Sequence, residues 1–312
     1  MKIGILGVKG RIGSALSVLA AGHGHSIVGY DLGDSRSALW EAFDADATVN
    51  FTQNLNYMFG PMRAYFDASE RVEKTADLAR FHANETPGQL FVPNCGIAPG
   101  ALNILAGKMM REAVGRIHEC MIYCGALPES RWKGYSVTWS PEGLANLYSE
   151  MVVERGMRGT DITVAPLAVR GTKWVMGSEF EYFNTSGGLG TLLESFPDTG
   201  PMGYRTLRYP GHLDQIIKMR AEGGDLAQKL IERWPDDGML DRVVASVNVL
   251  DGEVDHEIEF EVKPAPGLSA IQIATATGVL AAIEATKGMT GYIKQEDIPF
   301  DAWLQATDGV YA

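Results

Sequence analysis

The chain is poor in cysteine and has fewer cations than anions. Its 312 residues include three cysteines, 27 Lys and Arg residues and 39 Asp and Glu residues, which gives a formal net charge of -12. Three cysteines supply no disulfide framework for a chain of this length, and they are typical of a reducing, cytoplasmic location. Nucleic-acid phosphates repel an excess of negative charge, so we expect no nucleic-acid partner.

A long apolar run is also missing. No stretch approaches the ~20 consecutive apolar residues that span a bilayer, and the apolar start MKIGILGV is too short for a signal peptide. We therefore expect no membrane partner. Cys120 and Cys124 lie in a strand-like run without the further histidine or cysteine pair that would complete a zinc site. They are interpreted as core packing, and no metal site is predicted.

The first third of the chain alternates short apolar strands with helices. Hydrophobic residues make up 46% of the sequence and charged residues 21%, as in a globular protein. Strands separated by helices imply parallel βαβ units, which predicts an α/β fold of the Rossmann type. The predicted strands cover 2–6, 26–30, 47–52, 64–66 and 90–93, and the predicted helices cover 12–21, 36–43, 70–83 and 100–113, the last opened by Pro99-Gly100.

The pattern changes after Gly115, where strands follow one another with few helices between them. This predicts a second, α+β domain built on a mostly antiparallel sheet. Apolar strands of this kind commonly bury a face against a second copy, so a homo-oligomer, either a dimer or a tetramer, is expected. A Pro- and Gly-rich break at 263–267 precedes a long apolar helix at 269–287. The predicted strands cover 117–124, 136–139, 162–164, 179–182, 205–209, 243–250 and 256–262, and the predicted helices cover 213–221 and 226–233.

A glycine-rich turn joins the first strand to the first helix. Gly7, Gly10 and Gly13 form the pattern G-x-x-G-x-x-G. The first two glycines allow a tight turn close to a pyrophosphate, and Gly13 lets the helix and the strand approach closely. The amides at the start of the helix, where Arg11 and Ile12 lie, favour an anion. Together these features predict a dinucleotide-binding site.

Asp31 ends the second strand, eighteen residues after the last of these glycines. A carboxylate at this point accepts hydrogen bonds from the adenosine ribose and repels the extra phosphate of NADP, so NAD is predicted. Arg11 and Arg36 lie near enough in sequence to bind a phosphate, which leaves NADP as an alternative. Phe51 and Thr52 follow the third strand, and we expect them to line the cofactor crevice at the carboxyl edge of the sheet.

Two glycine-punctuated segments later in the chain combine several polar side chains. NTSGGLGTL runs from Asn184 to Leu192, and TLRYPGH runs from Thr206 to His212. They bring a hydroxyl cluster, Arg208 and His212 close together in the sequence. An arginine binds a carboxylate through two parallel hydrogen bonds, and a histidine transfers protons near neutral pH. The segments are therefore candidates for a substrate site.

These two segments and FVPNCGIAPG, from Phe91 to Gly100, resemble the saccharopine dehydrogenase-like family, most closely its lysine 6-dehydrogenase branch. The resemblance implies hydride transfer between a nicotinamide and a C–N bond. Lysine 6-dehydrogenases oxidise the lysine side-chain amine with NAD and release ammonia and an aldehyde, which closes to a cyclic imine. In this family the last long helix packs on the Rossmann domain. The resemblance thus implies an NAD-binding domain of residues 1–115 and 267–312, and an inserted substrate, catalytic and oligomerisation domain of residues 116–266.

An amino-acid substrate gives roles to several of these residues. Arg208 is the candidate for binding the substrate carboxylate. Glu142, in SPEGL, is a candidate for pairing with the α-ammonium group, and an exposed turn glutamate is the alternative. The candidates for hydrogen bonds to the carboxylate or the α-amino group are Thr185, Ser186 and the backbone amides of Gly187 and Gly188.

Hydride loss from an amine carbon requires a neutral nitrogen, so a base must take the ammonium proton. His212 is one candidate, because the preceding Pro210-Gly211 turn is expected to expose its ring; a structural or helix-capping histidine is the alternative. Asp67 matches an aspartate that the family places near the nicotinamide. Cys95, in PNCG, matches a family position beside the cofactor, either as a weak acid or, in the favoured interpretation, as a small apolar wall.

Three other functions remain open. An imine reductase that joins an amine to a carbonyl compound, as saccharopine- or carboxynorspermidine-forming relatives do, would need a second organic substrate in place of ammonia. A non-catalytic NAD-binding protein would turn over no amine. A dihydrodipicolinate reductase-like enzyme is suggested only by G-x-x-G-R-x-G, and the inserted domain has no His-His pair or Lys-rich loop to bind a dicarboxylate. We favour the amine dehydrogenase.

Overall fold

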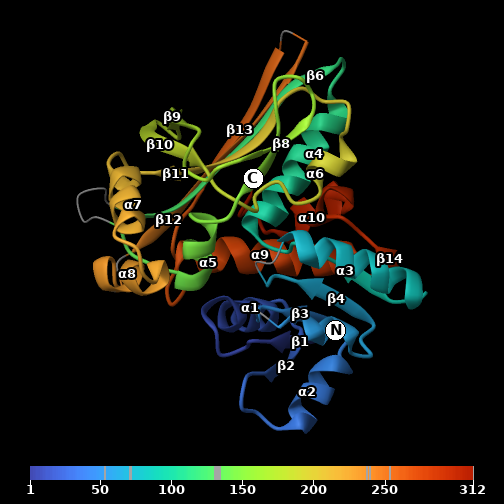
Figure 1. Ribbon diagram of the computed structural model, residues 1–312. Coiled ribbons are helices and arrows are strands. Elements are labelled where there is room, and N and C mark those ends of the chain that lie inside the picture. Colours follow the sequence, from blue (N-terminus) through green and yellow to red (C-terminus); the bar gives the residue numbers. More distant parts are fainter. Residues whose placement is uncertain are drawn as a thin grey trace. The chain divides into compact units, whose positions relative to one another are not determined.

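A computed structural model describes residues 1–52, 54–69, 72–129, 135–236, 238, 240–252 and 254–311 (Figure 1). The chain divides into two compact units. The first unit comprises Met1–Lys108 and Gln272–Ala312, and the second unit comprises Met109–Ile271.

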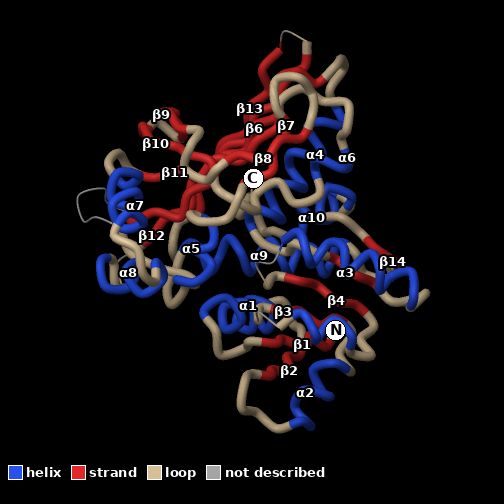
Figure 2. Tube along the Cα trace, viewed as in Figure 1, coloured by secondary structure: helices blue, strands red, loops and turns tan. Residues whose placement is uncertain are grey.

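The first unit is built on a six-stranded sheet in the order β14-β5-β4-β3-β1-β2. All neighbouring strands are parallel, so the predicted α/β Rossmann-type fold is confirmed. Helices alternate with the strands along the chain (Figure 2). The strands are β1 (Lys2–Leu6), β2 (Ser26–Tyr30), β3 (Ala47–Asn50), β4 (Ala64–Asp67), β5 (Leu90–Val92) and β14 (Gly291–Tyr292).

Helices α1 and α2 of the first unit lie where their apolar spacing predicts, whereas α10 was not predicted. In α1 the buried residues are Gly13, Ala15, Leu16 and Ala20, which recur at helical spacing. Helices α1 and α2 contact β1 and β2, whereas α3 contacts β5 and β14. The elements are α1 (Arg11–Gly22), α2 (Arg36–Phe43), the short 3₁₀ helices η1 (Leu55–Phe59) and η4 (Gln295–Asp297), α3 (Val72–Glu85) and α10 (Phe300–Ala306), with α4 (Leu102–Glu112) and α9 (Ala270–Ala285) running from one unit into the other.

The second unit is built on an eight-stranded mixed sheet in the order β13-β12-β6-β11-β10-β9, with β7 pairing β11 and β8. Among the described strands of this second sheet, only the β11–β6 pair is parallel, so the predicted mostly antiparallel sheet is confirmed. The strands are β6 (Ile117–Pro128), β7 (Val152–Arg155), β8 (Asp161–Val164), β9 (Arg170–Val175), β10 (Ser178–Asn184), β11 (Met202–Arg208), β12 (Asp241–Asp251) and β13 (Val254–Val262), and the helices are α5 (Pro141–Leu147), α6 (Leu192–Ser195), α7 (His212–Ala221) and α8 (Leu226–Arg233).

Some of the predicted elements are wrong. The strand predicted at 136–139 is a connection outside any sheet, tied down where the amide of Val137 donates to the carbonyl of Trp234 at 3.0 Å. The helix predicted to open at Pro99 begins at Leu102, because Gly100 adopts φ 136°, which no α-helix accommodates. The predicted helix 70–83 starts in residues outside those described, and α3 is observed from Val72.

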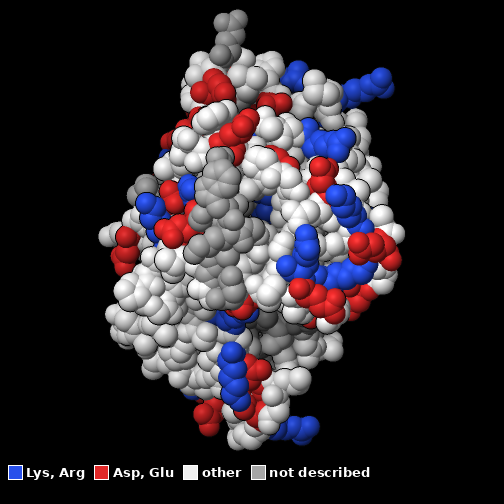
Figure 3. Space-filling model, turned by 90° about the vertical axis from the view of Figure 1, so that its left-hand side faces the viewer, with Lys and Arg blue, Asp and Glu red and all other residues white. Residues whose placement is uncertain are grey.

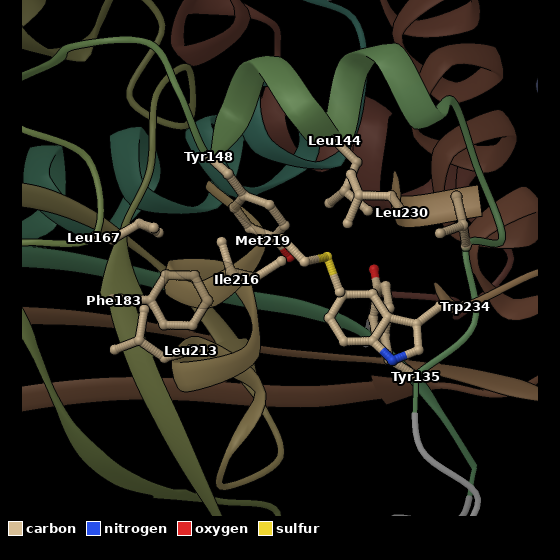
Figure 4. Packing of buried hydrophobic residues seen from close by; sticks show 11 residues of the cluster. Tyr135, Leu144, Tyr148, Leu167, Phe183, Leu213, Ile216, Met219, Leu230 and Trp234 are labelled. Atoms are coloured by element: carbon tan, nitrogen blue, oxygen red, sulfur yellow. The ribbon is translucent and has the colours of Figure 1, made fainter. Parts of the chain in front are cut away.

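Helix α5 was missed, although its start carries local signals. Ser140 caps the helix by accepting from the amide of Gly143, and Pro141 occupies the first turn, where its missing N–H leaves no hydrogen bond unmade. The helix is short, and it is held by tertiary packing. A buried cluster joins residues from α5, α7, α8 and β10 (Figure 4). Its largest members are Tyr135, Tyr148, Phe183 and Trp234.

The approach of α1 to β1 yields a stability prediction. A β-carbon on Gly13 would lie 2.2 Å from the carbonyl oxygen of Gly7, whereas one on Gly22, in the same helix, would meet no atom within 4 Å. We expect Gly13→Ala to destabilise the protein by about 1–3 kcal/mol through overpacking. Gly22→Ala, the matched control, should leave stability unchanged or slightly raised. Urea unfolding of both variants measures the difference, and equal midpoints would contradict the packing argument.

Candidate functional site

The glycine turn of the first unit presents backbone amides at the start of α1. Gly7 has φ 87°, and the amide of Gly10 donates to its carbonyl at 3.0 Å, which closes the turn. Gly10 caps α1 without any side-chain hydrogen bond. The N–H groups of the first helical turn therefore have no side-chain cap, which is the arrangement that binds anions.

Asp31 lies directly against this turn. One carboxylate oxygen accepts from the backbone amide of Lys9 at 2.8 Å, and the other accepts from the amide of Leu32 at 2.8 Å. The carboxylate is thereby fixed at the end of β2, half-buried beside the turn. This is the position from which a carboxylate reaches ribose hydroxyls in a dinucleotide fold.

The other residues predicted for the cofactor border the same turn. A β-carbon on Gly7 would lie 3.3 Å from the side chain of Thr52 and 3.4 Å from that of Phe51. These two residues, which directly follow β3, therefore lie next to Gly7. Ile12 is half-buried in the first turn of α1, while Arg11 is exposed and its carbonyl accepts from the side chain of Gln272 at 2.9 Å. The tight packing at Gly7, Gly10 and Gly13 leaves little or no room for side chains at these three positions, as a closely bound pyrophosphate requires.

Asp67 sits at the carboxyl end of β4 in a buried hydrogen-bonded cluster. One oxygen accepts from the hydroxyl of Tyr65 at 2.6 Å and from the amide of Asn50 at 3.4 Å. The other accepts from the hydroxyl of Ser69 at 2.6 Å and from its backbone N–H at 3.0 Å. Burial raises the pKa of the Asp67 carboxyl, and the bonds from Ser69 and Tyr65 act in the opposite direction.

Cys95 lies beside this cluster. Its backbone amide donates to the carbonyl of Asp67 at 2.6 Å, and its sulfur receives the side-chain amide of Gln295 at 3.2 Å. Burial, followed by the nearby Asp67 carboxylate, raises the pKa of the Cys95 thiol. A protonated thiol in this position is a neutral, small side chain rather than a nucleophile.

In the second unit, Arg208 and His212 are brought together by a residue the sequence did not single out. The Nε of Arg208 donates to the hydroxyl oxygen of Tyr148 at 3.0 Å, and that oxygen lies 3.0 Å from Nε2 of His212. Because a guanidinium only donates, the tyrosine oxygen accepts from Arg208, and the same hydroxyl shares a second hydrogen bond with Nε2 of His212. All three side chains are buried.

His212 is the first residue of α7, and its ring is only 5% exposed. The prediction that the Pro210-Gly211 turn exposes this ring is therefore wrong. The ring stacks on Trp234 at 4.5 Å between centroids and meets the edge of Tyr135 at 4.7 Å. Burial and the charge of Arg208 lower the pKa of His212 well below its ordinary value, so the imidazole is neutral at neutral pH.

The hydroxyl and glycine candidates surround β11. Thr185 is fully buried, and its hydroxyl bonds the hydroxyl of Thr206 at 2.8 Å. Ser186 donates to the carboxylate of Glu150 at 3.4 Å, and Gly187 adopts φ 92°. A β-carbon on Gly188 would lie 2.0 Å from the ring of Tyr204, so the segment can cross β11 only with glycine there.

Glu142 is exposed in the first turn of α5, where a carboxylate stabilises the helix start. No partner of its side chain is seen among the described residues. Cys120 and Cys124 are free and buried, which confirms their interpretation as core packing.

Sequence reasoning missed several residues of both clusters. The sequence could have indicated Tyr65, because this residue lies two positions before Asp67 and so shares its face of β4. Asn50 pairs in register with Asp67 from the neighbouring strand. Tyr148 had no such signal: it is sixty residues from Arg208 and follows a short helix that was not predicted.

Three further features bear on the possible ligands of the chain: its surface charge, its potential metal ligands and the length of its apolar helices. On the face shown in Figure 3, Lys and Arg side chains are interspersed with Asp and Glu rather than gathered in one basic patch. Among the described residues, no three His, Cys, Asp or Glu side chains are arranged to hold a metal ion. No described helix has the length and apolar composition to cross a bilayer.

Comparison with solved structures finds chains of similar fold that match nearly the whole chain. The saccharopine dehydrogenase (L-Glu forming) of Saccharomyces cerevisiae matches with a TM-score of 0.67 at 14% identity, over 99% of this chain and 96% of that chain. The homospermidine synthase of Legionella pneumophila, solved with NAD, matches with a TM-score of 0.68 at 11% identity, over 100% and 89%. An engineered D-amino acid dehydrogenase bound to NADP+ matches with a TM-score of 0.53 at 11% identity, over 97% and 95%.

The family is shown by the sequence itself. The profile of the saccharopine dehydrogenase C-terminal domain matches residues 96–283, more than half of the chain. The chain belongs to the saccharopine dehydrogenase family, and the family resemblance seen in the sequence motifs is confirmed at that level.

The buried, neutral His212 predicts how stability depends on pH. In the unfolded chain its imidazole, with an ordinary pKa of about 6.5, takes up a proton that the native state does not. Below that pH the native state therefore loses up to about 1.4 kcal/mol per pH unit from this residue. We expect His212→Gln to lose less stability than the unsubstituted protein between about pH 7 and pH 5.

Urea unfolding at a series of pH values makes this measurement. His118→Gln, which removes an exposed histidine of β6, is the matched control and should keep the original pH dependence. The same pH dependence in His212→Gln and in the control would show that His212 is not held neutral by the fold.

Proposed function

We propose that the protein is an NAD-dependent oxidoreductase that acts on the side-chain amine of lysine or a similar diamino acid. The reaction transfers a hydride from the amine-bearing carbon to NAD, and water hydrolyses the resulting imine to an aldehyde and ammonia. One protonated amine, one NAD+ and one water thus give one aldehyde, one ammonium ion, one NADH and one proton. The observation that carries this proposal is that Arg208 is buried and bonded to neutral groups among the described residues.

Three of the described arginines of the second unit are buried, and they differ in their partners. Arg155 pairs with Asp161 at 2.9 Å, and Arg205 pairs with Glu154 at 2.6 Å. Arg208, only 3% exposed, donates to the Tyr148 hydroxyl and to the carbonyl of Leu207, and no carboxylate pairs with it among the described residues. A buried cation without an anion is costly. A substrate carboxylate would supply the missing anion.

The surroundings of Arg208 suit an organic anion. Its guanidinium lies over the ring of Tyr135 at 5.0 Å and over that of Tyr148 at 5.9 Å. These aromatic faces keep water away and hold the planar group by cation–π contact. Thr185, Ser186 and the amides of Gly187 and Gly188 remain the proposed neighbours for the carboxylate or α-amino group, and Glu142 the proposed partner of the α-ammonium.

For the cofactor, the glycine turn and Asp31 support NAD. The uncapped start of α1 suits a pyrophosphate, and the Asp31 carboxylate suits an unphosphorylated ribose. The residues proposed to hold it are Gly7, Gly10, Arg11, Ile12, Gly13, Asp31, Phe51 and Thr52. Bound NAD would supply the hydride acceptor. Residues 1–115 and 267–312 are the proposed cofactor domain, and 116–266 the proposed substrate domain.

His212 and Asp67 remain the proposed bases. His212 is neutral and has a nitrogen already aimed at the Tyr148 hydroxyl, which links it to Arg208 and hence to the proposed carboxylate site. Asp67 already receives four hydrogen bonds from protein groups, so taking up a proton would disturb the contacts of the oxygen that it binds. The raised pKa of Asp67 favours its protonation, whereas the lowered pKa of His212 opposes protonation of the imidazole, so both residues are kept as proposed bases.

A second candidate function is condensation of an amine with a carbonyl compound, followed by reduction. It is favoured by two structures of the same fold whose names are saccharopine dehydrogenase and homospermidine synthase. In the reductive direction this reaction requires a second organic substrate, whereas the proposed deamination requires ammonia.

NADH formation from NAD with lysine, ornithine, diaminobutyrate or polyamines tests the proposal. A lysine ammonium has a pKa of about 10.4, so its deprotonation at neutral pH costs about 4–5 kcal/mol. We therefore expect a signal with lysine, equimolar release of ammonia, and rates that rise from about pH 7 to about pH 9. Silence with every amine, together with NADH oxidation when an amine and a keto acid are supplied, would instead establish the condensing enzyme.

Removing the Arg208 charge should abolish discrimination by the carboxylate. For Arg208→Met we expect kcat/KM for lysine to fall about a hundredfold or more, equivalent to about 2.7 kcal/mol. Cadaverine has the same side-chain amine but no carboxylate, so its already low kcat/KM should hardly change. Arg220→Met, which removes an exposed arginine of α7, is the control. Equal losses for lysine and cadaverine would remove Arg208 from carboxylate binding.

A further inference from the structure

A lysine in the glycine turn is tied to a second aspartate beside Asp31. Nζ of Lys9 lies 2.5 Å from Oδ1 of Asp34. Asp34 is itself anchored, because its Oδ2 accepts from the backbone amide of Asp31 at 2.8 Å and its own amide donates to the Asp31 carbonyl at 3.0 Å. The backbone amide of Lys9 in turn donates to the Asp31 carboxylate. Lys9, Asp31 and Asp34 thus form a closed ring of contacts.

This ring of contacts keeps the charge of Lys9 paired with that of Asp34. The hydrogen bond to Asp34 raises the pKa of Lys9, and the same bond lowers the pKa of Asp34, so both groups are charged across the neutral range. Since Asp31 is also a carboxylate, the three side chains together carry a net negative charge. An anion arriving beside Asp31 therefore meets repulsion, although a lysine is within reach of the same segment.

We infer that Asp34 makes the nucleotide site selective for NAD over NADP by holding Lys9 away from the position of the 2′-phosphate. This inference rests on the proposed function, in which the glycine turn and Asp31 bind the adenosine ribose. A 2′-phosphate carries close to two negative charges and would stand beside the Asp31 carboxylate. Lys9, which presents three donors on a flexible stem, is the group that would neutralise it if released. Asp34 is thus a specificity-determining residue that acts through Lys9.

Arg36 offers a competing explanation for any affinity toward NADP. It is the exposed first residue of α2, two positions after Asp34. A phosphate held by Arg36 would not depend on Lys9. Substitutions at these two cations therefore separate the two mechanisms.

The decisive variant is Asp34→Asn, which removes the charge but keeps an oxygen to accept from the Asp31 amide. Titration calorimetry of the full chain with NAD and with NADP measures both affinities. We expect Asp34→Asn to bind NADP about tenfold more tightly than the unsubstituted protein, equivalent to about 1.4 kcal/mol, with NAD affinity within about twofold. The gain should shrink at higher salt, because the new contact is an exposed ion pair.

Asp44→Asn is the matched control. It removes the same charge from an exposed ion pair with Lys2 in the same unit, away from the glycine turn, and should leave both affinities unchanged. The double variant Lys9→Met with Asp34→Asn should lose the gain in NADP affinity, whereas Arg36→Met with Asp34→Asn should retain it.

Each outcome decides the question. No gain in Asp34→Asn, a gain that survives Lys9→Met, or an unsubstituted protein that binds NADP as tightly as NAD would overturn the role of Asp34. Binding of neither nucleotide by the unsubstituted protein would instead remove the proposed function, and this inference with it.

Discussion

Much of the first unit depends on one close approach, between the carbonyl oxygen of Gly7 and the α-carbon of Gly13. A β-carbon at Gly13 would lie 2.2 Å from that oxygen, well inside van der Waals contact, so only glycine lets α1 begin this close to β1. Beside this approach, Gly10 leaves the start of α1 without a side-chain cap, and the amide of Lys9 donates to Asp31. The geometry of the proposed nucleotide site thus depends on the missing side chains of the glycines as well as on the contact between Lys9 and Asp31.

The two buried polar clusters are built in opposite ways. In the first unit, the charge of Asp67 is met by donors from Tyr65, Ser69 and Asn50. In the second unit, Arg208 has only neutral partners among the described residues. Because Arg208 is buried, its charge lacks the compensation that water or an anion would give. Burial of His212 and the nearby charge of Arg208 lower the pKa of His212 and keep its ring neutral. A ligand carboxylate would therefore bind where a charge is uncompensated and the dielectric is low.

The elements that are predicted well are those whose pattern is local and repeated. Strand 2–6 and helix 36–43 have the predicted bounds in the structure, because apolar spacing and turn residues define them. The segment 136–139 has an alternating pattern too, but it joins no sheet: Val137 bonds the carbonyl of Trp234, and Ser136 bonds that of Pro235. Alternation of apolar and polar residues indicates which side chains are buried. An extended segment packed beside a helix shows the same alternation as a strand in a sheet, so the pattern does not distinguish them.

Residue type and short spacing were enough to predict the Rossmann-type fold, the glycine turn with Asp31 at the next strand end, and the candidates Arg208 and His212. The folded chain was needed to learn that the ring of His212 is buried, that Tyr148 joins it to Arg208, and that Asp34 holds Lys9. The contacts of Tyr148 join side chains from separate elements, and packing fixes their distances and their exclusion from water. The Lys9–Asp34 pair is exposed, and the backbone contacts between Asp34 and Asp31 fix the position of Asp34. The state of charge of a buried group depends on that packing, so a linear pattern cannot give it.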